Sequence, residues 1–118
     1  MKKLVDIFTQ LVPEIEKWVT PRSVSSNKHT HCANEVSETV IKAVVINFIE
    51  YVLIQGKDVE MINIVEILDW LTSKAKEYRT ITKFPQDEVD AVLVVFINSI
   101  AGNHWGVDYC LYAKDLKK

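Results

Sequence analysis

The sequence has 118 residues, of which 48% are hydrophobic, and a formal net charge of −2 at pH 7. This length and composition predict one folded domain over residues 1–118 and exclude a disordered chain. A charge so close to zero provides no basic field for a nucleic-acid backbone, so nucleic acid is disfavoured as a partner. The preference for lysine over arginine, with abundant isoleucine, suggests an AT-rich bacterial genome, or a phage or mobile element living in one.

The sequence shows neither the pattern of a secretory signal nor that of a membrane span. The first residues place Asp6 within the apolar run, where a secretory signal would need an uninterrupted apolar core. No window approaches the roughly eighteen uncharged apolar residues of a membrane span, so no membrane partner is expected. The cysteines, Cys32 and Cys110, are expected to stay reduced. These features together predict a cytoplasmic protein.

The first predicted helix covers about residues 3–19, with apolar residues spaced alternately by four and three. Pro13 removes one backbone hydrogen bond within it, so the segment should be kinked or split there. Thr20 and Pro21 end the helix, because a residue before proline avoids helical torsions. A polar connection rich in serine, asparagine and threonine follows over residues 21–33.

Three more helices are predicted further along the chain. The second begins with Asn34 as its cap and ends near Gln55, where Gly56 suits a left-handed C-terminal position. The third covers about residues 59–78, with Asp58 as its cap.

The fourth opens at residues 84–88, with a proline and acids at its start, and ends near residues 102–103. The aromatic tail, residues 104–112, could be a strand, a short helix or an ordered coil. The expected fold is an all-α bundle of four main helices.

Two stretches of this bundle are unusually apolar, at residues 40–54 and 91–97. A helix that is hydrophobic almost all round is a buried helix, and a small chain has few ways to bury two of them. Ile46 and Leu53 lie inside the polar stripe of the second helix, and Val94 lies inside that of the fourth. These residues predict an interface, with a closely packed monomer as the competing interpretation.

A metal site is the first chemical possibility. His29, His31 and Cys32 lie in the polar connection, and His104 lies near the C-terminus. Imidazole and thiolate are the usual zinc ligands, but their spacing here is not that of known zinc modules. A solvated histidine loop is therefore favoured, and no cofactor is predicted.

A phosphate or nucleotide site is the second possibility. Arg22 and Lys28 lie among hydroxyl and amide side chains close to a helix N-terminus, where anions bind readily. His29, His31, His104 and Trp105 could complete such a site if the 22–32 loop meets the 104–112 tail. No glycine-rich phosphate loop is present, and a solvated loop is again the favoured interpretation.

No nucleophile motif or catalytic carboxylate pair stands out, so an enzyme is not expected. The sequence best fits a small non-enzymatic protein-interaction module that binds itself or another protein and belongs to a phage or mobile element. The alternative is a small-ligand or metal-binding protein that uses the 22–32 loop and the 104–112 tail.

Overall fold

A computed structural model describes residues 3–25, 28–32, 35–60 and 63–118. Within these residues the protein is all-α, as predicted, and contains no named strand. Its elements are α1 (Leu4–Trp18), α2 (Pro21–Ser25), α3 (Glu38–Gln55), α4 (Ile64–Tyr78), α5 (Gln86–Ser99), the π-helix η1 (Ile100–His104) and the 3-10 helix η2 (Ala113–Lys117). None of the helices in the described ranges is long and apolar enough to cross a membrane.

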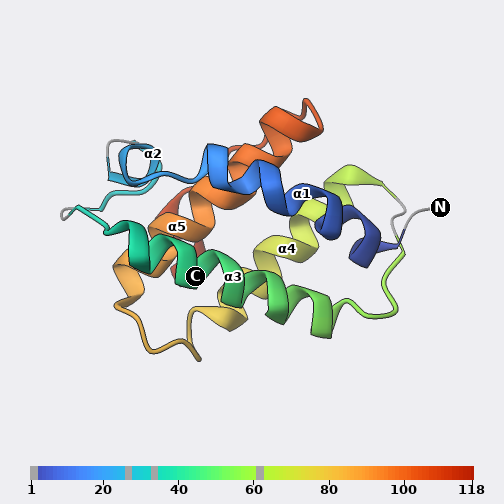
Figure 1. The fold of residues 1–118 in the computed structure, drawn as a ribbon, viewed down its shortest axis with the longest axis horizontal. Helices are drawn as coiled ribbons and strands as arrows, with labels where there is room; N and C mark the ends of the chain where they lie inside the picture. The colour runs from blue at the N-terminus through green and yellow to red at the C-terminus, as the bar shows by residue number, and fades with distance from the viewer. Residues whose placement is uncertain (1–2, 26–27, 33–34, 61–62) are drawn as a thin grey trace.

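Helix α5 is the centre of the fold. It packs against α1, α2, α3, α4 and η2, and Figure 1 shows it running behind α3. Every residue from Val89 to Ile97 is buried, including Val94 with no exposed surface. The prediction that Val94 forms an interface was therefore wrong, because neighbouring elements of the same chain cover all sides of α5.

Helix α3 lies between α1 and α4 and packs on α5 with one side only. Phe48 anchors that side, with its ring 5.4 Å from Phe96 and 5.5 Å from Tyr78. The side-chain oxygen of Ser37 caps the helix by accepting from the Val40 N–H. The helix thus begins later than predicted, and the proposed cap Asn34 lies outside the described residues.

Helix α1 is a single helix through Pro13, so the proline does not split it. Pro13 is exposed, whereas α1 enters the core through Leu4, Phe8, Leu11 and Ile15. The next segment was predicted to be irregular, but its first part forms α2. A reciprocal set of hydrogen bonds between Thr20 and Ser23 fixes this short helix.

Helix α4 begins at Ile64, because Asn63 accepts from the Glu66 N–H and acts as the cap in place of Asp58. The turn before it brings α1 and α4 close to Gly56. That glycine has a φ of −100°, so it is not in the left-handed conformation predicted for it. A Cβ atom there would lie against Leu4 and 2.8 Å from the Trp70 ring, so close packing explains the glycine.

The tail runs back along α5 after the π-helical turn. The Val107 N–H donates to the Ala101 carbonyl, and the Asn98 side chain both donates to and accepts from the Leu111 backbone. The tail then ends in η2, which packs on α4 and α5. Of the three conformations left open for residues 104–112, the ordered coil is the one observed, and η2 follows it.

Candidate functional site

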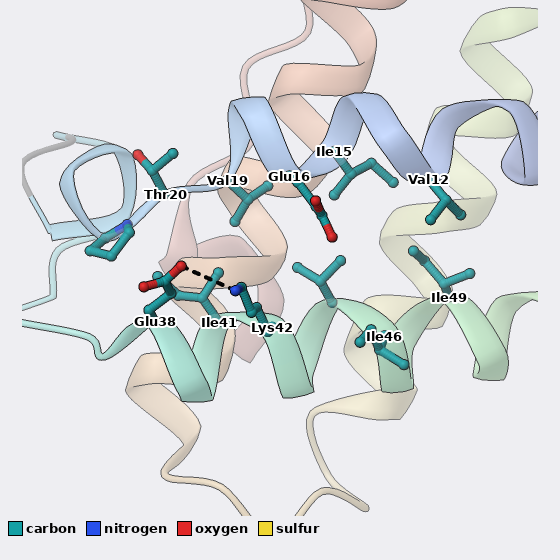
Figure 2. Close-up of a pocket in the computed structure, with 12 residues that line it drawn as sticks. Val12, Ile15, Glu16, Val19, Thr20, Glu38, Ile41, Lys42, Ile46 and Ile49 are labelled. Atoms are coloured by element: carbon teal, nitrogen blue, oxygen red, sulfur yellow. Dashed lines mark ion pairs between the residues drawn. The ribbon is translucent and has the colours of Figure 1, made fainter.

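A groove of about 170 Å³ lies between α1 and α3, and Figure 2 shows its walls. Ile15 and Val19 point from α1 toward α3, and Ile41 and Ile49 point back toward α1. These four side chains are almost fully buried and form the floor. The groove is lined by Val12, Ile15, Glu16, Val19, Thr20, Pro21, Glu38, Ile41, Lys42, Val45, Ile46 and Ile49.

Exposed apolar side chains stand at the edge of this floor. Val12 of α1 is 44% exposed, and Ile46 of α3 is 56% exposed. Ile46 lies on the outer side of α3, beyond the part of the groove that α1 covers (Figure 2). An apolar floor continuous with exposed apolar edges is the usual composition of a protein-binding surface.

Charged side chains frame the same surface. Lys42 donates to Glu38 across one helical turn at 3.2 Å, and both side chains are largely exposed. Glu16 enters the groove from α1 (Figure 2) and forms no ion pair with any described residue. The rim therefore carries both signs of charge around an apolar centre, as is common in protein interfaces.

The three predicted interface residues thus have different positions. Ile46 is exposed beside the groove, Leu53 is half-buried on the same face of α3, and Val94 is in the core. The sequence did not single out Val12, Glu16 or Lys42 as parts of a surface. The apolar stripe of α1 contained Val12, but only the position of α3 determines which side of that stripe stays uncovered.

The 22–32 loop does meet the tail, at the predicted residue His29, but its partners there are Cys110, Tyr112 and Ala113 rather than His104 and Trp105. The His29 carbonyl accepts from the Ala113 N–H at 2.9 Å, and the His29 Nδ1 lies 3.4 Å from the Cys110 Sγ. The Tyr112 ring packs against the His29 ring at 4.3 Å between centroids. The hydrogen bond with the Cys110 thiol also raises the pKa of Tyr112.

His104 and Trp105 lie elsewhere. His31 and Asp87 line a pocket of about 290 Å³ beside the start of α5, together with Thr30, Asp90, Ala113, Lys114 and Lys117. His104 ends η1 at the opposite end of this continuous helix, roughly 25 Å further along its axis. Its ring lies beside that of Trp105. The predicted convergence of His29, His31 and Cys32 with His104 does not occur.

The described residues do not assemble a metal site either. No group of three histidine, cysteine, aspartate or glutamate residues in the described ranges could hold a metal ion. Arg22 and Lys28 are both exposed. In the pocket beside α5, Thr30 donates to the Val24 carbonyl and Asp90 is bound to Arg79. Two of its polar groups therefore already bond within the protein.

The Arg79–Asp90 pair was not recognised in the sequence. Nε of Arg79 donates to one Asp90 oxygen at 2.7 Å, and Nη2 donates to the other at 3.1 Å. The Asp90 side chain is 1% exposed, and its hydrogen bond raises the pKa of Arg79. Asp90 belongs to the polar stripe of the fourth predicted helix, but its pairing with Arg79 lets α5 bury it.

No protein-family model, curated protein or solved structure matches this chain significantly. Any functional conclusion therefore depends on the surfaces described above.

Proposed function

We propose that this chain is a small non-enzymatic protein-interaction module that self-associates through the face made by α1 and α3. One observation carries this proposal. The exposed apolar side chains of Val12 and Ile46 stand beside an apolar groove with a mixed-charge rim. Scattered exposed apolar residues are normal on any protein, but a contiguous set around a groove is typical of an interaction site.

The energetic reason is the apolar area that stays in contact with water. Burying one such side chain contributes about 1.5–3 kcal/mol. A symmetric dimer buries each of them twice, so Val12 and Ile46 together supply a substantial driving force for association. Helix α3 has more apolar side chains than α1, α4 and α5 cover, so a partner on this face would bury apolar surface of α3 that is otherwise exposed.

Sedimentation equilibrium of the purified chain tests this proposal. We expect the wild-type protein to be a dimer at about 100 µM, a concentration that populates moderately tight complexes. Ile46→Glu should then give a monomer that remains folded. Val65→Glu is the matched control, because Val65 is 54% exposed, close to the value for Ile46, and lies on α4.

Two results would contradict the proposal. The first is a wild-type chain that stays monomeric at roughly several hundred micromolar, because such a chain does not self-associate. Equal loss of association in Val65→Glu and Ile46→Glu would show that the α1/α3 face has no special part in it.

A further inference from the structure

We propose that the second copy binds through an antiparallel pairing of the two α3 helices, related by a two-fold axis beside Ile46. This inference rests on the self-association proposed above and specifies its geometry. The observation behind it is the order of side chains along the exposed face of α3, where Lys42, Ile46 and Glu50 follow one another at intervals of four residues.

These three side chains share one face of the helix. Four residues advance an α-helix by slightly more than one turn, so each side chain lies about one turn beyond the previous one. All three are exposed. Leu53 continues the same face, two turns after Ile46, and is half-buried. The face thus presents a cation, an apolar centre and an anion in line.

This order is self-complementary when the second helix runs in the opposite direction. A two-fold axis at Ile46 places each Ile46 against its counterpart. The residue one turn before Ile46 then faces the residue one turn after it in the partner, so Lys42 of each copy faces a glutamate at position 50. Two intermolecular ion pairs result, one on each side of an apolar contact.

The same charges oppose the parallel arrangement. In a parallel pair, Lys42 would face a second lysine and Glu50 would face a second glutamate. Like charges held opposite each other across an interface are destabilising, so the charge pattern selects direction as well as register. The intramolecular Lys42–Glu38 pair is exposed and therefore weak enough for Lys42 to be shared with the partner.

The groove contributes the remaining apolar contact. Ile49 lies one turn after Ile46 on the groove side of α3, and Val12 lies across from it on α1 (Figure 2). In the antiparallel pair, the partner's α3 passes along this edge and covers both side chains. An interface based on one helix of 18 residues is smaller than the roughly 800 Å² per partner of tight complexes. We therefore expect a dissociation constant in the micromolar range.

Charge reversal tests this pairing. Lys42→Glu and Glu50→Lys each place like charges opposite each other at both ends of the interface. Each single variant should weaken dimerisation at least about tenfold. The double variant restores opposite charges at both positions, so its dissociation constant should return to within about threefold of the wild-type value.

A matched control separates a local effect from a change of net charge. Lys118→Glu makes the same charge change and breaks a comparable exposed ion pair, with Asp115, on η2. It should leave the dissociation constant unchanged. Lys42→Glu places a second negative charge beside Glu38 within the same helix. Thermal unfolding at dilutions where all variants are monomeric should show that this variant still folds.

The outcomes distinguish the two proposals. Suppose that Ile46→Glu dissociates the wild-type dimer, but that the double charge variant dimerises no better than the single charge variants. This result would overturn the antiparallel pairing and leave self-association standing. A monomeric wild-type chain would overturn both. Recovery in the double variant, with no effect of Lys118→Glu, would support the pairing.

Discussion

Helices α3 and α5 have similarly apolar sequences, yet they are buried to different extents in the structure. Helix α5 is enclosed by four helices and the returning tail, so even its polar residue Asp90 is buried. Helix α3 is covered by α1, α4 and α5 over only part of its surface, and Ile46 and Ile54 remain exposed. An apolar helix is therefore buried only as far as the chain supplies neighbours for it. The uncovered side of α3 is the surface that the proposed self-association uses.

The strongest test of this difference introduces the same charge into both helices. Val94→Asp places an unpaired carboxylate in the core and should lower the free energy of unfolding by about 4 kcal/mol or more, or prevent folding. Ile46→Asp should lower it by less than about 1 kcal/mol, because its side chain meets water. Urea denaturation of dilute, monomeric protein measures both. Similar losses for the two variants would contradict the difference in burial.

The buried ion pair at the start of α5 comes next in expected effect. Asp90→Ala leaves the Arg79 guanidinium largely buried without its carboxylate, and should cost about 3 kcal/mol of unfolding free energy. Glu77→Ala is the control, since its 2.9 Å pair with Lys74 leaves the carboxylate half exposed. The control should cost less than about 1 kcal/mol. Equal costs would mean that Asp90 is not enclosed as described.

Substitution of Gly56, at the C-terminal end of α3, should have a smaller effect on the free energy of unfolding. Gly56→Ala adds a methyl group against Leu4 and Trp70, and should lower the free energy of unfolding by about 1–3 kcal/mol through overpacking. Gly102→Ala is the natural comparison, because a Cβ there meets nothing within 4 Å. It should be neutral or slightly stabilising, since alanine favours helix by up to about 1 kcal/mol. Thermal unfolding of both variants checks this, and a stable Gly56→Ala protein would refute the close approach.

The smallest expected effect concerns the tail that covers α5. Tyr109 shares hydrogen bonds with Thr72 and Asp69 of α4, so Tyr109→Phe should cost about 1 kcal/mol. Burial raises the pKa of Tyr109 above its ordinary value of 10.0. The unfolded chain therefore loses this proton first, and the stability that depends on it is present below pH 10 and declines above it. Tyr109→Phe should flatten this alkaline decline, and an unchanged slope would contradict the assignment.

Apolar periodicity in the sequence located the four long helices, because burial of one helical face imposes that period on any sequence. The helix starts were harder to predict, since several capping residues were available at each. Ser37 caps α3 and Asn63 caps α4, while the proposed caps, Asn34 and Asp58, came three and five residues earlier. Nothing local ranks one such cap above another.

The prediction of which α5 side chains are exposed was wrong for a different reason. Val94 was assigned to a polar stripe because Asp90 and Asn98 share that stripe. Both polar residues prove to be used internally, one by Arg79 and the other by the Leu111 backbone. A polar residue indicates solvent only if the chain provides no partner for it. The sequence also does not reveal the path of the tail. His31 and His104 were therefore expected to lie together, although they do not.

The central position of α5 also has a consequence for the growing chain on the ribosome. All four other α-helices pack against α5, but every one of them is synthesised before it. The nascent chain thus carries the apolar faces of α1 to α4 without the element that joins them. Because the fold depends on contacts between distant residues, its completion must await translation of α5, and the incomplete chain is exposed to premature association meanwhile.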